Sequence, residues 1–220
     1  MEMPSVSTEH SSTAAKSSSP ALWIILASVV SVVVIAGASW WFLFRSTSHD
    51  FRYGHYDPPQ AAPALVNAVD QHGQSFSLDD YRGKVVFLYF GYTHCPDACP
   101  ATLDEFMEVK ENLGNKADDV AFVMVTVDPS RDSPERMTEY LDFWDPAFHG
   151  VSMSQEDTES VAREWSVFFT YEEKNSRGGY LVDHDVSSYV IDKDGNKRLT
   201  YPLGADTTTM AKDAEYLLQE

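Results

Sequence analysis

The sequence predicts an α/β domain that follows one apolar segment near the amino terminus, and three patterns support this prediction. Residues 85–90 (VVFLYF) and 120–127 (VAFVMVTV) are continuous apolar runs of strand length, typical of strands buried on both faces of a sheet. A helix-forming segment separates the two runs, and the order strand, helix, strand implies a right-handed parallel crossover. Residues 21–44 are apolar and carry no charge, so they stand apart from the domain.

The first helix is predicted to begin in the segment that contains Cys95 and Cys99 and to end near Gly114. Ser133 as the N-cap and Pro134 at the first helical position predict the start of the next helix. The apolar face of that second helix is expected to consist of Met137, Tyr140, Leu141 and Trp144.

The carboxy-terminal part is expected to contain a hairpin and a closing helix. The hairpin strands are predicted over residues 188–191 and 198–201, on either side of an Asp194-Gly195 turn. A helix over residues 207–218 closes the domain. This order of elements is that of a thioredoxin-like fold, with the two cysteines at the amino terminus of the first crossover helix.

Residues 21–44 are long enough for a transmembrane helix. At about 1.5 Å per residue they span roughly 36 Å, against a hydrocarbon core of ~30 Å. Trp23 and residues 40–41 (WW) lie near the two ends, where aromatic residues of the membrane interface occur. A cleaved signal peptide is the alternative, because residues 36–38 (AGA) resemble a cleavage site. The apolar run continues beyond that site, which favours a single uncleaved anchor.

The segments on either side of the anchor differ in composition from the domain, which is expected over residues 64–220. Residues 1–20 are rich in Ser and Thr and lack apolar periodicity, so we expect a disordered tail. Their lack of arginine argues against a mitochondrial targeting peptide and favours a bacterial membrane. Residues 45–63 contain prolines and aromatic residues and are expected to form a juxtamembrane linker. The basic residues near the span leave its orientation open.

The chain is strongly acidic. It contains 16 Lys and Arg against 34 Asp and Glu, a formal charge of −18. Such a surface repels phosphate backbones, which argues against nucleic acid as a partner. The charge is compatible with docking on a basic partner and equally with a merely solvated surface.

Cys95 and Cys99 are the only cysteines, and they form the main chemical signal of the sequence. A helix amino terminus favours the thiolate, which is both the nucleophile of thiol exchange and a metal ligand. Redox exchange, a structural disulfide and a soft-metal site are therefore all open. A disulfide between residues four apart would close a very short loop and would stabilise the fold little.

Two further observations favour the metal site. Three residues separate the cysteines, rather than the two of thioredoxin oxidoreductases, and this spacing puts both thiols on one helix face. The chain has no proline between Pro146 and Pro202, where such oxidoreductases carry a cis-proline, and His184 lies in that region instead. Two thiolates and an imidazole suit Cu(I), or Cu(II) with an added oxygen ligand, and zinc also accepts them. His94 is at most an outer residue of such a site, and His149 is expected in a loop.

Three runs of the sequence, in this order, resemble the Sco/SenC family of copper proteins. They are 92–100 (YTHCPDACP), 127–134 (VDPSRDSP) and 180–184 (YLVDH). The resemblance covers roughly residues 64–220, and it implies a thioredoxin-like domain that is anchored in the bacterial inner membrane and faces the periplasm. The disordered tail over residues 1–20 is then cytoplasmic. It also implies that Cys95, Cys99 and His184 bind copper, as Cu(I) or Cu(II), with one ion per chain.

The function that this resemblance implies is assembly of the dinuclear copper centre of cytochrome c oxidase subunit II, by delivering copper, by reducing that subunit's cysteines, or both. The implied partners are subunit II and a periplasmic copper donor. One residue departs from the family pattern. Asp185 follows the histidine, where the family commonly has a small hydroxyl residue, and its carboxylate either offers an oxygen to Cu(II) or faces solvent.

Functions of different classes therefore remain open. A copper chaperone, which is not an enzyme, uses Cys95, Cys99 and His184 as ligands. A thiol–disulfide oxidoreductase uses Cys95 as the nucleophile and Cys99 as the resolving thiol, and it does not need His184. A redox or copper sensor is a third hypothesis, for which the amino-terminal tail is too short to be an output domain.

Overall fold

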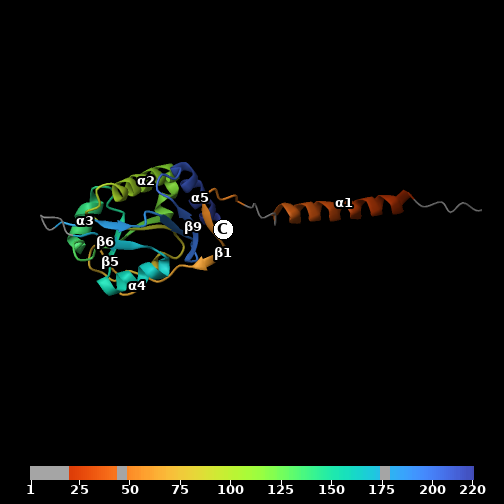
Figure 1. The fold of residues 1–220 in the computed structure, drawn as a ribbon. Helices are drawn as coiled ribbons and strands as arrows, with labels where there is room; N and C mark the ends of the chain where they lie inside the picture. Colours follow the sequence, from red (N-terminus) through yellow and green to blue (C-terminus); the bar gives the residue numbers. More distant parts are fainter. Residues whose placement is uncertain (1–19, 44–48, 174–178) are drawn as a thin grey trace, which may run out of the picture. The chain divides into compact units, whose positions relative to one another are not determined.

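The computed structural model describes residues 20–43, 49–173 and 179–220, and it divides into the units Met1–Ser48 and His49–Glu220 (Figure 1). The first unit contains helix α1 (Pro20–Leu43). Within α1, Trp23–Trp41 has a mean hydropathy of 2.2 and is long and apolar enough to cross a membrane. The predicted tail, apart from Pro20, lies outside the described residues.

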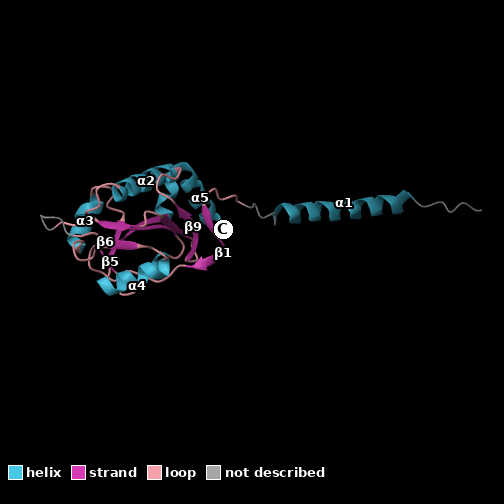
Figure 2. Ribbon diagram, in the orientation of Figure 1, coloured by secondary structure: helices cyan, strands magenta, loops and turns pink. Residues whose placement is uncertain are grey.

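The second unit is built on a seven-stranded sheet with the strand order β1-β9-β8-β3-β4-β5-β2 (Figure 2). The three strands β3, β4 and β5 are parallel, and all other pairs in the sheet are antiparallel. The strands are β1 (Gly54–Ala61), β2 (Val69–Asp70), β3 (Val85–Gly91), β4 (Val120–Thr126), β5 (His149–Ser152), β8 (Ser188–Ile191) and β9 (Asn196–Tyr201). This is the predicted thioredoxin-like arrangement.

Helices cover both faces of the sheet (Figure 1). Helices α2 and α5 lie together on one face, and α4 lies on the other. The α-helices are α2 (Ala98–Leu113), α3 (Pro134–Asp142), α4 (Gln155–Trp165) and α5 (Thr207–Gln219), and two short 3₁₀ helices are η1 (Leu78–Tyr81) and η2 (Gly114–Asp119).

Strand β3 forms the centre of the core because both of its faces are covered. Phe87 and Tyr89 point to one face, where their rings lie 5.7 and 5.6 Å from that of Phe106 in α2. Phe90 points to the opposite face and contacts Trp165 of α4, with 5.8 Å between ring centroids. This alternation explains why residues 85–90 are continuously apolar. Because both faces of β3 are packed, its carboxyl end is held firmly at the edge of the core.

A second, two-stranded sheet pairs β6 (Phe169–Tyr171) with β7 (Val182–His184) in an antiparallel register. We refer to these two strands as the ribbon. Phe169 lies opposite His184 in this register. The ribbon is not hydrogen-bonded into the main sheet as a strand neighbour, so its position depends on other contacts with the domain.

The structure confirms several local predictions. Strand β8 has the predicted bounds, and α5 extends the predicted closing helix by one residue at its end. Ser133 caps α3 by accepting a hydrogen bond from the Arg136 backbone N–H, and Pro134 is its first residue. Trp144, expected on the apolar face of this helix, instead lies two residues beyond its last residue, Asp142.

Other local predictions were wrong. Residues 54–61, within the predicted linker, form the edge strand β1, which pairs with β9. Most side chains of β1 are exposed, so the strand has no apolar alternation, and proline is tolerated at a sheet edge. His149 begins strand β5 rather than lying in a loop. Helix α4 and the two strands of the ribbon were not predicted from the sequence.

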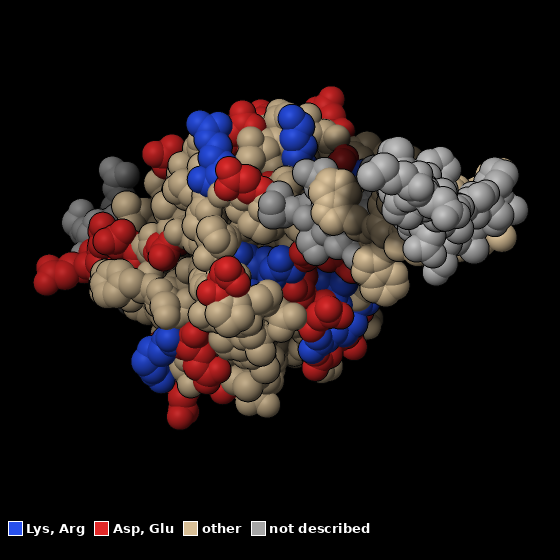
Figure 3. Space-filling model, turned by 90° about the vertical axis from the view of Figure 1, so that its right-hand side faces the viewer, with Lys and Arg blue, Asp and Glu red and all other residues tan. Residues whose placement is uncertain are grey.

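One face of the molecule carries both acidic and basic side chains. Figure 3 shows one face of the molecule, on which the side chains of Asp and Glu alternate with those of Lys and Arg. The acidic excess of the chain therefore does not exclude local basic groups on this face.

Candidate metal centre

The two cysteines lie where strand β3 turns into helix α2. The helix begins at Ala98, so Cys95 lies in the turn before it rather than within it, and only Cys99 is helical. Asp97 occupies the N-cap position but its side chain makes no capping hydrogen bond. The Cys99 backbone N–H instead donates to the Cys95 Sγ atom over 3.4 Å. The sulfur of Cys95 therefore occupies the place of a capping oxygen.

His184, at the end of the ribbon, meets the cysteines from the opposite side. Its Nε2 atom lies 3.5 Å from the Cys99 Sγ atom. Its Nδ1 atom lies 2.8 Å from the backbone oxygen of Asp185 and donates its proton to it. This bond keeps a proton on Nδ1, so that Nε2 is the nitrogen that binds a metal once it loses its own proton, which is the usual arrangement of a metal-ligating histidine.

The three side chains are arranged so that they can hold one ion. Their ligand atoms all lie within 4.8 Å of one another. Atoms bound to a common ion at about 2.0–2.3 Å are at most ~4.6 Å apart, so only a small inward movement is needed. Cys99 is fully buried, whereas Cys95 and His184 are partly exposed. Among residues 20–43, 49–173 and 179–220, no other group of three such side chains is close enough to hold a metal.

The pKa values of the two thiols are shifted in opposite directions. The hydrogen bond from the Cys99 thiol, followed by those from His184 and the backbone, lowers the pKa of Cys95 to about 3 despite partial burial. The neighbouring Cys95 sulfur and burial raise the pKa of Cys99 far above its usual value. Burial lowers the pKa of His184, but its hydrogen bond to Cys95 outweighs this and the pKa is raised. The centre therefore holds one ready thiolate, and Cys99 must lose a proton before it can bind a metal.

Gly91 allows the buried thiol to approach the end of β3. A Cβ atom on Gly91 would lie 2.8 Å from the Cys99 Sγ atom and 2.6 Å from a ring carbon of Tyr89. Both distances are too short for any side chain. Sequence analysis did not single out this glycine, although a glycine that ends a buried apolar run signals such a close approach.

The centre has two halves: the cysteine half, with Cys95 and Cys99, and the histidine half, which is the ribbon strand that carries His184. Tyr92 contacts both halves. Its backbone N–H donates to the Cys99 Sγ atom over 3.5 Å. Its hydroxyl accepts the Val182 N–H over 3.1 Å, two residues before His184. The rings of Tyr92 and His184 meet edge to face, with 5.6 Å between centroids.

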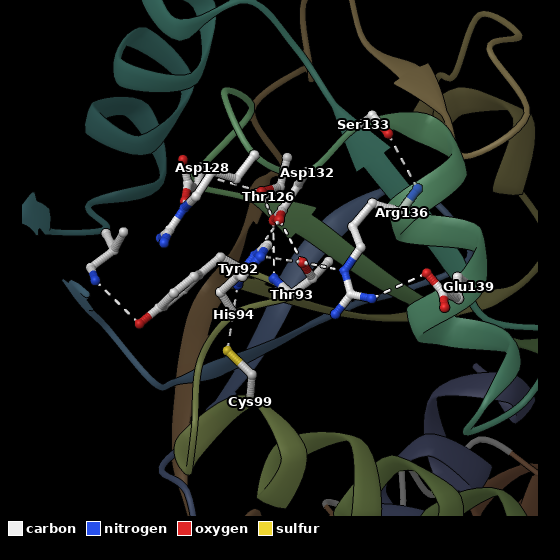
Figure 4. Close-up of polar contacts among 12 residues, drawn as sticks. Tyr92, Thr93, His94, Cys99, Thr126, Asp128, Asp132, Ser133, Arg136 and Glu139 are labelled. Carbon is white, nitrogen blue, oxygen red and sulfur yellow. Dashed lines mark hydrogen bonds and ion pairs between the residues drawn. The ribbon is translucent and has the colours of Figure 1, made fainter. Parts of the chain in front are cut away.

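A buried carboxylate supports the segment that precedes Cys95 (Figure 4). Asp132 is 1% exposed. It accepts hydrogen bonds from the Thr93 N–H over 3.0 Å, from the Thr93 hydroxyl over 2.6 Å and from the Thr126 hydroxyl over 2.6 Å. Sequence analysis identified the run 127–134 only by resemblance, and the structure gives Asp132 this physical role.

The remaining candidate residues lie outside the ligand cluster. His94 is 42% exposed at its side chain and directs Nδ1 to the Thr93 hydroxyl, 3.0 Å away. The Asp185 carboxylate accepts the Ser187 N–H over 2.7 Å, and the residue contacts His184 through its backbone oxygen. Asp185 therefore contacts the imidazole through its main chain, while its carboxylate binds the Ser187 N–H.

Fold and site together define a thioredoxin-like domain with a cysteine–cysteine–histidine centre at the end of its central strand. The family model described as SCO1/SenC matches residues 62–219. The chain therefore belongs to the SCO1/SenC family, as the three sequence runs indicated.

Individual relatives agree with this assignment. Protein sco1 of Schizosaccharomyces pombe is 36% identical over 141 residues, which cover 62% of this chain and 53% of that protein. The chain thus spans about half the length of that relative. An SCO2-like protein of Rickettsia prowazekii is 31% identical over 171 residues, which cover 76% of this chain and 83% of that protein. The structure of Bradyrhizobium japonicum ScoI with copper bound aligns with a TM-score of 0.64 and 33% identity, covering 68% of this chain and 95% of that one.

Proposed function

We propose that this protein is a membrane-tethered copper chaperone that assembles the dinuclear copper centre of cytochrome c oxidase subunit II. The observation that carries the proposal is the convergence of Cys95, Cys99 and His184, whose ligand atoms lie within 4.8 Å of one another. Each ion would be bound by one chain and passed on, so copper is the cargo of the protein rather than a cofactor of catalysis. A periplasmic protein would supply the metal.

The chemistry of the ligands supports copper. Two thiolates and one imidazole form a soft ligand set that suits Cu(I). A structural zinc site normally has four protein ligands, and the described residues provide three at this position. The copper-bound ScoI of B. japonicum, at 33% identity, supports the same metal for this chain.

The uneven exposure of the ligands suits transfer. Cys95 and His184 are partly exposed, so an incoming ligand from a partner can reach the ion on their side. Cys99 is fully buried and holds the ion against the end of β3. The Cys95 thiolate accepts the metal first, and binding by Cys99 releases its proton. In the reverse direction, a partner's soft ligand replaces Cys95 and His184 before Cys99.

Helix α1 supports the membrane tether in this proposal. We place residues 21–44 in the bacterial inner membrane, with the domain in the periplasm and the short amino-terminal tail in the cytoplasm. The length and hydropathy of Trp23–Trp41 support the span. A tether keeps the chaperone near a membrane-bound acceptor and raises its effective concentration there. Acidic side chains of the domain would guide docking on a basic partner surface.

Substitution of the third ligand tests the proposal. We expect the reduced full-length protein in detergent micelles to bind one Cu(I) per chain. His184→Ala should lower this affinity by more than about 100-fold, since changes even to residues outside the ligand set cost about 10- to 100-fold. The measurement is competition with a chromophoric Cu(I) chelator. His94→Ala is the matched control, because His94 adjoins Cys95 but lies outside the cluster, and its affinity should stay at the wild-type value. Unchanged affinity in His184→Ala would contradict the three-ligand centre.

A second function, thiol–disulfide exchange with partner cysteines, is favoured by the difference in pKa between Cys95 and Cys99. The partly exposed Cys95 thiolate is suited to attack a partner disulfide, which forms a mixed disulfide and releases one partner thiolate. Cys99 then attacks Cys95 as a thiolate, which leaves an internal disulfide and a fully reduced partner. His184→Ala should retain this exchange with a model disulfide, whereas Cys95→Ser should abolish it.

A further inference from the structure

One turn contacts the two halves of the centre through two separate carboxylates. Residues 128–132 follow strand β4, and the N–H groups of Arg131 and Asp132 donate to the Asp128 carbonyl over 3.1 and 3.0 Å. Asp128 and Asp132 are 0% and 1% exposed. Buried carboxylates are stable only when they are paired or fully hydrogen-bonded, so the contacts of both are required by the fold.

The carboxylate of Asp132 serves the cysteine half. It binds the N–H and hydroxyl of Thr93, two residues before Cys95, as Figure 4 shows. None of the described hydrogen bonds of Asp132 reaches the ribbon that carries His184.

The carboxylate of Asp128 serves the histidine half through Arg131. Arg131 Nε donates to Asp128 in an ion pair, and Nη1 donates to the backbone oxygen of Tyr180 over 2.9 Å. The guanidinium carbon lies 3.6 Å from the centroid of the Tyr180 ring. The Tyr180 hydroxyl donates to Asp128 over 2.9 Å. Arg131 and Asp128 therefore hold Tyr180 by its backbone, its ring and its hydroxyl, four residues before His184.

The ribbon needs such an attachment. Isolated two-stranded sheets are marginally stable in water, and this ribbon is not a neighbour of any strand in the main sheet. The 180–184 segment is hydrogen-bonded to the rest of the domain by Tyr180, at the 128–132 turn, and by Val182, at the Tyr92 hydroxyl. The opposite strand of the ribbon is held separately by the Tyr171 hydroxyl, which donates to the backbone oxygen of Val127 over 2.6 Å. Without the Tyr180 bonds, the 180–184 segment keeps the Val182 bond to Tyr92 and its pairing with the strand that carries Tyr171.

We propose that Arg131, fixed by Asp128, is the positioning residue of the third metal ligand. It holds the 180–184 segment so that the His184 Nε2 atom stays beside the Cys99 Sγ atom, while Asp132 independently positions the cysteines. The inference rests on the proposed function, because it concerns the same centre. A guanidinium is required, since a lysine ammonium cannot bind the Asp128 carboxylate, the Tyr180 carbonyl and the Tyr180 ring together.

The test compares Arg131 with an arginine that does not contact the centre, in the full-length protein in detergent micelles. Arg131→Gln is expected to lower Cu(I) affinity by about 10- to 100-fold, as is usual for residues that orient a ligand. Arg131→Lys should not restore it. Arg82→Gln is the control for the loss of one positive charge, because Arg82 pairs with Asp79 and has no described hydrogen bond to the centre or the ribbon, and its affinity should change by no more than about twofold. Equal losses in both glutamine variants would show a general charge effect and overturn the proposal.

Two measurements separate positioning from a merely structural role. In the metal-free protein, hydrogen exchange at the Val182 amide should be faster in Arg131→Gln, while exchange at the Thr93 amide, which donates to Asp132, stays unchanged. In a His184→Ala background, Arg131→Gln should change affinity by no more than about twofold further, because it acts through His184. Losses that simply add would overturn the inference.

A second variant keeps the test decisive if Arg131→Gln does not fold. Tyr180→Phe retains the Arg131–Asp128 ion pair and removes only the hydroxyl bond to Asp128, so it should lower affinity less but speed exchange at Val182. Wild-type affinity and exchange in this variant would overturn the positioning role. If His184→Ala itself leaves copper affinity unchanged, the proposed function fails. If His184→Ala weakens binding and the Arg131 and Tyr180 variants do not, the positioning inference alone fails.

Discussion

At the scale of single residues, Cys95 and Cys99 are near neighbours in sequence but lie in different surroundings. Cys95 precedes α2, is partly exposed and receives hydrogen bonds from a thiol, an imidazole and backbone N–H groups. Cys99 is buried beneath Gly91 and beside the Tyr92 N–H. Cys95 is therefore the more accessible of the two thiols, and a partner protein would reach it before Cys99.

Alkylation should reveal this difference. Because the pKa of Cys95 is lowered to about 3, its thiolate is fully formed at every pH above about 5. We expect iodoacetamide to modify Cys95 at nearly the same rate from pH 5 to pH 8, whereas an ordinary thiol with a pKa of about 8.5 would react several hundred-fold faster at pH 8. Peptide mass spectrometry of the reduced, metal-free protein measures both sites. A rate at Cys95 that rises like that of free cysteine would contradict the assignment.

Gly91→Ala tests the close packing behind Cys99. The added methyl group meets the Cys99 sulfur and the Tyr89 ring, and overpacking of this kind costs about 1–3 kcal/mol in the free energy of unfolding. Displacement of the sulfur should also weaken copper binding. Gly54→Ala is the control, since a Cβ atom there meets its nearest neighbour at 3.6 Å, an ordinary contact. Urea unfolding of the two variants should separate them, and equal stabilities would refute the steric argument.

At the scale of secondary-structure elements, the ends of helices and strands place the site. The carboxyl ends of β3 and β4 lie side by side, with Gly91 paired to Thr126. The cysteine turn follows the first strand and the 128–132 turn follows the second, so the two meet directly. This is the usual position of functional groups at the edge of a parallel sheet.

The cap of α3 is an element whose contribution can be measured. Ser133 accepts the Arg136 N–H over 3.3 Å, and loss of such a cap costs about 1 kcal/mol. Ser133→Ala should therefore lower the free energy of unfolding by about that amount. Ser130→Ala, the same change at an exposed residue three positions earlier, should be neutral. Chemical denaturation with both variants is the measurement, and a neutral Ser133→Ala would show that the cap contributes nothing.

At the scale of the whole molecule, the chain joins an apolar helix to an acidic domain. The stretch Trp23–Trp41 meets the length and hydropathy requirements of a span. The same requirements are met by some signal sequences, so the state of the mature protein distinguishes an anchor from a leader.

The intact mass of the native protein decides between these two. We expect protein purified from membranes to retain residues 21–44, because the apolar run continues past the A-x-A-like site at residues 36–38. The protein should remain in the membrane fraction after washing with high salt and carbonate. A mature chain that begins after Ala38 and is found in the soluble fraction would show that the segment is a cleaved leader.

Signals carried by consecutive residues of the chain were predictable. Residues 85–90 and 120–127 are apolar because both faces of β3 and β4 are covered, and Ser133-Pro134 starts α3 through its own backbone chemistry. Strand β1 was missed because an exposed edge strand needs no apolar alternation. The ribbon was missed because its strands are short and stabilise each other only when paired.

The sequence by itself determined the order of elements, the dithiol with its three-residue spacing, and His184 as the candidate third ligand. Those features depend on local periodicity and on residue chemistry, both of which can be read along the chain. Only the tertiary structure decided that His184 lies 3.5 Å from Cys99 and that Asp128, Arg131 and Asp132 support the two halves. These contacts join residues far apart in sequence, and their distances depend on how the sheet, the turn and the ribbon pack together.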